Sequence, residues 1–226
     1  MSSAAAPSPE LVHHMEAAAH WRLLGQVFSY PGSGWAGRIE LLIECLREER
    51  YAELARAALR GSSPELWMRL FGPAGPVRTR AVAWLGGIQP GYLLAELSAF
   101  YEAFGFEPPA GCAPDQLPAL LDFAAWLELK LAYACVQRDG ERVEVTQRAL
   151  KTFLERFVAP LAWPVYRQLE GCGYGLFEEA ARLAAGQSGP EPERQHPAPE
   201  AWPDGAPPED GSCGAFPGPV DLKGQS

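Results

Sequence analysis

Charged side chains stand inside the most apolar stretch of this chain, CAPDQLPALLDFAAWLELKLAYACV, at residues 112–136. The stretch opens on Pro114-Asp115 and also carries Asp122, Glu128 and Lys130. An isolated buried charge is very costly, so a carboxylate in such a segment must be paired, hydrogen-bonded or protonated. The chemistry open to these acids is therefore ion pairing inside the protein or recognition of a basic partner.

A helical wheel at about 100° per residue divides these charges between two faces of one helix. One narrow stripe, which we expect to meet water, contains Asp115, Asp122, Trp126, Lys130 and Tyr133. Glu128 falls on the opposite, apolar face with Leu117, Leu121, Ala124, Leu131 and Cys135. A helix that is apolar over most of its circumference is a central helix of its fold.

Two interpretations of Glu128 stay open at the sequence level. It pairs with an Arg or Lys from a neighbouring helix, or it lines a groove left open for a ligand. Asp115 is explained without any function as an acid in the first helical turn, where the helix dipole favours negative charge.

Other sets of chemically active residues are incomplete. His13 and His20 stand seven residues apart on one helical face, but nothing nearby supplies a third metal ligand. Five scattered cysteines without a C-x-x-C pair favour neither a disulfide framework nor a zinc site. Phosphate-binding, dinucleotide-binding, zinc-protease and nucleophile-elbow motifs are all missing. We therefore predict a protein that is not an enzyme and has no cofactor.

Charge and hydropathy exclude further classes of protein. The formal net charge is −9 and no basic stripe occurs, which disfavours nucleic-acid binding and regulation of transcription, and suits a basic partner. No run of about 18 apolar residues supports a membrane span, and the first residues do not form a secretory signal. We expect a cytoplasmic protein.

The sequence predicts that all the elements that must position these residues are helices. An apolar 3.6-residue period begins near residue 10, Ser63-Pro64 signals a helix start, and Gly105 signals a helix end. We predict helices over residues 10–27, 39–47, 51–59, 92–104 and 141–157, and over 160–185 with interruptions at Pro164 and at 171–175. A long Gly- and Pro-rich connection over residues 72–91 is expected to be functional or pinned to the fold.

The predicted fold is an all-α helical bundle in one domain, with three segments along the chain. Residues 1–9 form a disordered leader, and residues 10–186 form the helical domain. Residues 187–226, with nine prolines, six glycines and seven acids, form an acidic disordered tail.

The order of several segments resembles the TorD/DmsD/NarJ family of cytoplasmic chaperones for molybdenum-containing oxidoreductases. These are HWRLLGQVFSYP, LFGPAGPV, LLAELSAFYEAFGFEP, PDQLPALLDFAAWL and FLERFVAPLAWPVYRQL, within residues 15–186. The family's P-D-H-L motif corresponds to Pro114, Asp115, Gln116 and Leu117. The P-x-x-L-E-F continuation of the nitrate-reductase branch corresponds to Pro118, Leu121, Asp122 and Phe123.

Three departures accompany the resemblance. Gln116 replaces the family's histidine and cannot titrate near neutrality, and Asp122 replaces the branch's glutamate. Leu120 stands where another branch has a glutamate, so the nitrate-reductase branch and its relatives are the closer kin.

The resemblance implies a client-specific chaperone that binds the apo catalytic subunit of a molybdoenzyme, with its N-terminal leader peptide, until the cofactor is inserted. It also implies a monomer or weak dimer. Client leaders in this family carry basic residues followed by an apolar stretch. The expected peptide-binding residues are Asp115, Gln116, Asp122 and Glu128, with Tyr101 and Phe104 as an apolar wall. The alternative is a helical protein that binds a small ligand or nucleotide.

Overall fold

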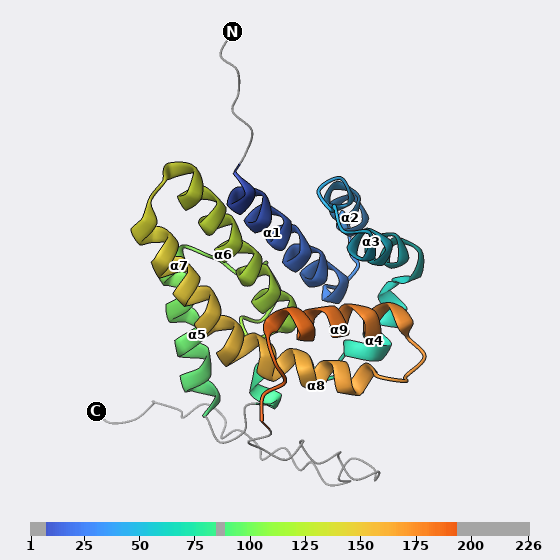
Figure 1. The fold of residues 1–226 in the computed structure, drawn as a ribbon. Helices are drawn as coiled ribbons and strands as arrows, with labels where there is room; N and C mark the ends of the chain where they lie inside the picture. Colours follow the sequence, from blue (N-terminus) through green and yellow to red (C-terminus); the bar gives the residue numbers. More distant parts are fainter. Residues whose placement is uncertain (1–7, 85–88, 194–226) are drawn as a thin grey trace, which may run out of the picture.

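A computed structural model describes residues 8–84 and 89–193 of the chain and shows a bundle of helices around one core (Figure 1). Among these residues no strand forms, and the predicted all-α fold is confirmed. The helices are α1 (Pro9–Phe28), α2 (Trp35–Ile43), α3 (Glu49–Gly61), α4 (Pro64–Phe71), α5 (Pro90–Phe104), α6 (Leu117–Gln137), α7 (Gly140–Phe153), α8 (Ala159–Leu169) and α9 (Gly175–Ser188), with the short helices η1 (Ala81–Ala83) and η2 (Leu154–Val158).

Local signals placed several helix ends correctly. The Ser63 hydroxyl accepts a hydrogen bond from Leu66 N at 3.2 Å, and Pro64 is the first residue of α4. Gly105 ends α5 with φ 63°, a left-handed conformation that favours glycine. The end of α9 at Ser188 lies just beyond the boundary predicted at residue 186. Residues 1–7 of the predicted leader and 194–226 of the predicted tail lie outside the described residues.

The interruption predicted at Pro164 is wrong, whereas the one at residues 171–175 separates α8 from α9. Pro164 lies inside α8, where it removes one backbone hydrogen bond. Its neighbours Leu161, Ala162 and Val165 are fully or almost fully buried. Packing of these side chains stabilises the helix on both sides of the proline, so α8 continues past it.

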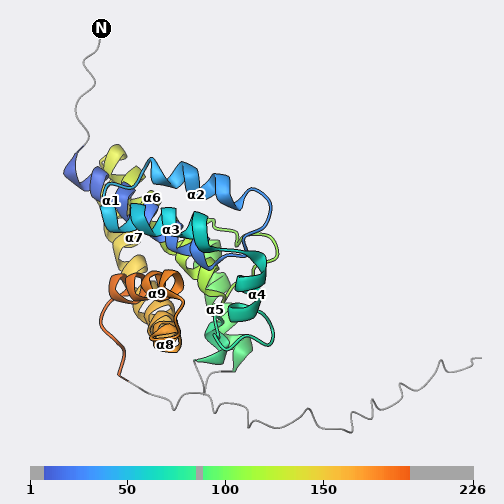
Figure 2. The same cartoon turned by 90° about the vertical axis from the view of Figure 1, so that its right-hand side faces the viewer.

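α6 is the central helix, as its apolar circumference predicted. It runs beside α1 with the most extensive contact between any two helices of the described residues, and α7 packs on another side of it (Figures 1 and 2). Leu117, Leu121 and Phe123, which match the family motif, are fully buried. The Phe123 ring is the centre of an aromatic cluster that attaches α5, with ring centroids 4.9 Å from Tyr101 and 4.6 Å from Phe153.

The close contact between α1 and α6 depends on Gly25. A Cβ atom at this position would lie 2.6 Å from Asp122 Oδ1 and 3.4 Å from the Pro118 carbonyl oxygen of α6. The Asp122 carboxylate would have to shift, and because it is buried between the two helices such a shift disturbs their packing.

We therefore expect Gly25→Ala to lower the free energy of unfolding by about 1–3 kcal/mol, the usual cost of overpacking. Urea denaturation measures this change. Gly37→Ala in α2 is the matched control, because nothing lies within 4 Å of its added Cβ. That control should be neutral or stabilising by up to about 1 kcal/mol, since alanine is the better helix former. Equal effects of the two substitutions would contradict the packing account.

No helix among the described residues is long and apolar enough to cross a membrane.

Candidate functional site

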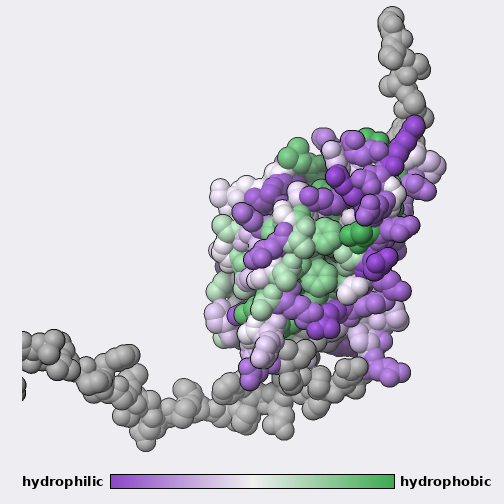
Figure 3. Space-filling model, turned by 90° about the vertical axis from the view of Figure 1, so that its left-hand side faces the viewer, coloured by the Kyte–Doolittle hydropathy of each residue, from purple (hydrophilic) through white to green (hydrophobic). Residues whose placement is uncertain are grey.

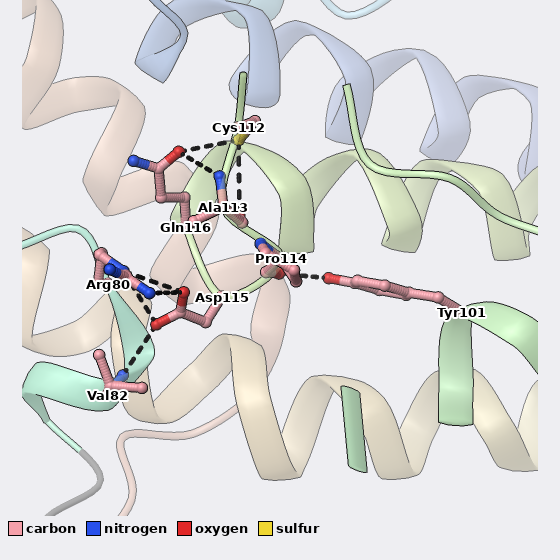
Figure 4. Close-up of polar contacts among 8 residues, drawn as sticks. All are labelled: Arg80, Val82, Tyr101, Cys112, Ala113, Pro114, Asp115 and Gln116. Atoms are coloured by element: carbon pink, nitrogen blue, oxygen red, sulfur yellow. Dashed lines mark hydrogen bonds and ion pairs between the residues drawn. The ribbon is translucent and has the colours of Figure 1, made fainter. Parts of the chain in front are cut away.

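The Pro114-Asp115-Gln116 sequence forms the turn that leads into α6, and we name residues 112–116 the motif turn (Figure 4). Asp115 precedes the N-cap residue Gln116, so its predicted place in the first helical turn is wrong. Its carboxylate is fully buried and accepts hydrogen bonds from Arg80 Nη2 at 2.7 Å, Arg80 Nε at 3.0 Å and Val82 N at 3.2 Å. Asp115 therefore binds the long connection instead of capping a helix.

Backbone hydrogen bonds reinforce this attachment. Ala81 N donates to the Asp115 carbonyl oxygen at 2.9 Å, and Leu117 N donates to the Thr79 carbonyl oxygen at 2.8 Å. These bonds flank an isolated antiparallel bridge between Arg80 and Gln116. Residues 79–82 of the predicted long connection are thus pinned to the start of the central helix.

The motif turn also holds α5. The Tyr101 hydroxyl donates to the Pro114 carbonyl oxygen at 2.6 Å (Figure 4). Within the turn, Gln116 Oε1 accepts from Ala113 N at 3.0 Å and from Cys112 Sγ at 3.0 Å. Burial raises the pKa of the Cys112 thiol to about 11, so this sulfur stays protonated as a donor. One short turn therefore positions both the pinned connection and α5.

Asp122 is buried between α6 and α1, so its predicted exposure to water is wrong. The residue lies on the face of α6 that α1 covers, and its Oδ2 atom is 2.7 Å from Arg22 Nη1 of α1. That contact is an ion pair without good hydrogen-bond geometry, and neither Asp122 oxygen has another donor among the described residues. Burial raises the pKa of Asp122 to about 6, against the opposing effect of the Arg22 charge.

Glu128 is buried as predicted, and its partner comes from a neighbouring helix. That partner is a histidine, where the sequence suggested Arg or Lys. His14 Nδ1 of α1 lies 2.7 Å from Glu128 Oε2. Burial raises the pKa of Glu128, and the His14 hydrogen bond opposes this effect. Glu128 also lines a depression in the surface, so its two proposed roles are compatible.

A groove of about 710 Å³ lies between the C-terminal end of α5, the C-terminal half of α6 and the start of α7. Its apolar lining includes Phe104, Tyr133 and Val145, and the charged groups Lys130 and Glu141 also line it. It lies on the side of the molecule that carries α5 and α7, where apolar side chains gather in one patch (Figure 3). Of the predicted site residues only Phe104 lines this groove.

Comparison with known proteins agrees with the resemblance seen in the segments. Residues 46–163 match the family described as nitrate reductase delta subunit. The chain is 32% identical over 196 residues to the selenate reductase assembly chaperone protein of Thauera selenatis, which covers 80% of this chain and 96% of that protein. The chain belongs to the nitrate reductase delta subunit family. Because this is a family of assembly chaperones, the prediction that the chain is not an enzyme is confirmed.

The delta-subunit fold accommodates glutamine at the motif's histidine position through the contacts described above. The side-chain oxygen of Gln116 accepts hydrogen bonds from Cys112 and Ala113 of its own turn. These contacts need a neutral acceptor, so they do not require a group that titrates. No cluster of three metal-ligating side chains occurs within residues 8–84 and 89–193. The four described cysteines are free thiols.

Sequence reasoning missed the partners of the acidic residues. Arg80, Arg22 and His14 lie 35, 100 and 114 positions from the carboxylates they contact. No helical period links such distant residues. Gly25 gave a weak signal, as a glycine within a strongly helical apolar segment.

Proposed function

We propose that this chain is a cytoplasmic chaperone dedicated to one molybdenum-containing oxidoreductase. It binds the catalytic subunit before the cofactor is present and holds it for cofactor insertion and assembly. The similarity to a selenate reductase assembly chaperone over 80% of the chain carries this proposal. An acidic helical domain without a catalytic constellation among its described residues is consistent with it.

The client's N-terminal leader peptide is proposed to place its apolar stretch in the groove between α5, α6 and α7. Phe104, Tyr133 and Val145 offer apolar surface there, and burial of such surface supplies most of the affinity for an apolar segment. The buried acids Asp115 and Asp122 have no surface to offer a peptide in this conformation.

The motif turn contributes to client binding by positioning the groove. Tyr101 attaches α5 to the turn, and the last residue of the same helix, Phe104, lines the groove. Asp115 and Gln116 shape the turn that receives the Tyr101 hydroxyl. In this proposal Asp115, Gln116 and Tyr101 are positioning residues, and Phe104 contacts the peptide.

Co-purification from the native host tests the function. The tagged full-length chain should capture the catalytic subunit of a molybdoenzyme, enriched in its cofactor-free form. A bound small molecule or nucleotide without such a subunit would instead support the alternative, a helical ligand-binding protein. The captured subunit also supplies the leader sequence for the binding measurements below.

Val145→Glu should weaken binding of the leader peptide at least about tenfold, because it places a charge where apolar surface is buried. Isothermal titration with the synthetic leader measures the change. Leu41→Glu is the matched control, since Leu41 is an exposed aliphatic residue of α2, away from the groove (68% exposed, against 51% for Val145). Equal affinities of the two variants would remove the groove from the client-binding surface.

A further inference from the structure

A second depression, of about 510 Å³, lies between α1, α3 and α9 and is separate from the apolar groove. Titratable side chains make up much of its wall. Those used in the argument below are Glu16, His20, Glu48, Arg50, Glu128 and Arg182. This set of residues has no part in the motif turn or in the groove proposed for the apolar stretch.

His20 is the most unusual member of this wall, because it is buried without a complete set of hydrogen bonds. Its side chain is 7% exposed, and Nε2 has no hydrogen-bond partner within the described residues. The ring stacks on Tyr51 with centroids 3.7 Å apart and planes 8° apart. The Tyr51 hydroxyl donates to Gln187 Oε1 at 2.7 Å, which fixes the stacked pair against α9.

The surroundings of His20 determine which kind of group Nε2 requires. Nδ1 lies 3.9 Å from Glu48 Oε1, so a proton on Nδ1 is favoured by that carboxylate. Burial lowers the pKa of His20, although the charges of Glu48 and Glu16 oppose this and Arg50 adds to it. The ring is then neutral with its proton on Nδ1, and Nε2 is a hydrogen-bond acceptor without a donor.

The charges around the depression favour a cation over an anion. Arg50 Nε is 2.8 Å from Glu48 Oε2, and Arg182 Nη2 is 2.6 Å from Glu179 Oε1, so both arginines already have carboxylate partners. Glu16 is paired with Arg47 at 3.2 Å. Among the described residues the Glu128 carboxylate contacts the imidazole of His14 and has no arginine or lysine partner, so it can accept hydrogen bonds from an incoming cation.

We propose that this depression binds a cationic N–H donor, a guanidinium or ammonium group carried by a basic residue of the client polypeptide. The group donates to His20 Nε2 and lies close to the Glu128 and Glu48 carboxylates. This inference rests on the proposed chaperone function for the source of the cation. The net charge of −9 attracts such a segment before contact is made.

Two small probes test the site without any client. N-acetylarginine methylamide carries the guanidinium, and N-acetylcitrulline methylamide has nearly the same shape without the charge. In NMR titrations of the full-length chain, the arginine probe should shift the resonances of His20 and Tyr51. It should bind at least about tenfold more tightly than the citrulline probe, the scale of a charged hydrogen bond. Equal binding of the probes, or no shift at His20, would overturn the proposal.

His20→Phe separates binding from packing, because it keeps the stacking on Tyr51 and removes Nε2. The variant should bind the arginine probe at least about tenfold more weakly, while its melting temperature stays equal or rises. Glu48→Gln, a change at an exposed rim residue, should also weaken binding and serves as the second variant if His20→Phe does not fold. Glu40→Gln is the matched control and should bind as the wild type does, because Glu40 is an exposed carboxylate of α2 that lines neither depression. Wild-type affinity in both His20→Phe and Glu48→Gln would overturn the site.

The source of the cation is tested with the leader of the captured subunit. Replacing its basic residues by citrulline should weaken binding to the wild type much more than binding to His20→Phe. An equal loss in both proteins would show that the client's basic residues bind elsewhere and overturn this assignment, even if the arginine probe occupies the depression. Failure to capture any reductase subunit would contradict the proposed function alone, since the probe titrations do not depend on a client.

Discussion

Asp115→Ala is expected to lower the free energy of unfolding by about 3 kcal/mol, at the low end of the cost of breaking a buried ion pair because Arg80 stays half exposed. The substitution removes the acceptor of the Arg80 hydrogen bonds and leaves Val82 N without its partner. Urea denaturation measures the loss. Hydrogen exchange at Ala81 and Val82 should accelerate more than exchange in α9, because the connection is no longer pinned.

The same variant tests the positioning role of the motif turn. If Asp115 acts through the turn, leader affinity falls by a similar factor at low and high salt, because a buried carboxylate has no exposed charge to screen. Tyr101→Phe is the control for the attachment of α5 to the motif turn, since it deletes only the hydroxyl that donates to the Pro114 carbonyl oxygen. It should increase hydrogen exchange in α5 and leave Ala81 and Val82 protected. A loss of affinity for Asp115→Ala that disappears at high salt would indicate direct contact with the client.

The second large effect is a pH dependence that originates at Asp122. Its pKa is about 6 in the folded chain, raised by burial from the ordinary value of 3.8. Protonated Asp122 is therefore better tolerated in the folded state than the charged form. The contribution of this group to the free energy of unfolding is complete below about pH 4 and is lost as the pH rises through 6. Between pH 4 and pH 8 the wild type should lose about 3 kcal/mol relative to Asp122→Asn, the free energy of a shift of about two pKa units.

Urea unfolding of both proteins across this pH range gives the difference directly, because all other titrating groups are shared. The stability of Asp122→Asn relative to the wild type should rise with pH, with its midpoint at about pH 5, between the unfolded and folded pKa values. Glu141→Gln, at an exposed carboxylate with no resolved ion pair among the described residues, should show no such rise. Parallel stability curves for the wild type and Asp122→Asn would mean that Arg22 fully compensates the buried charge.

Because Asp115 and Asp122 are both buried, the two acids of the family motif make internal contacts in this chain and do not form an exposed surface. Asp115 attaches the connection that leads to α5, and Asp122 occupies space that Gly25 of α1 leaves free. The sequence suggested acids on a peptide-binding surface, whereas the structure gives them internal partners. In the proposed function, the influence of Asp115 on a client passes through the motif turn and the position of α5, whose last residue Phe104 lines the apolar groove.

The sequence by itself determined the fold class, the central position of α6 and the burial of Glu128. These follow from local rules: a 3.6-residue apolar period, a serine-proline helix start, a left-handed glycine at a helix end. The segments around Pro114 and Phe123 likewise indicated the family.

Tertiary structure alone decided the environment of each charge. The wheel placed Asp122 on the one polar stripe of its helix, but α1 covers that stripe and brings Arg22 to it. Asp115 binds Arg80 from a connection without any period, and His20 has its place beside Tyr51 and Glu48 only because α1, α3 and α9 meet. Periodicity describes one helix at a time, whereas a charge responds to whichever distant side chains packing brings within a few ångströms.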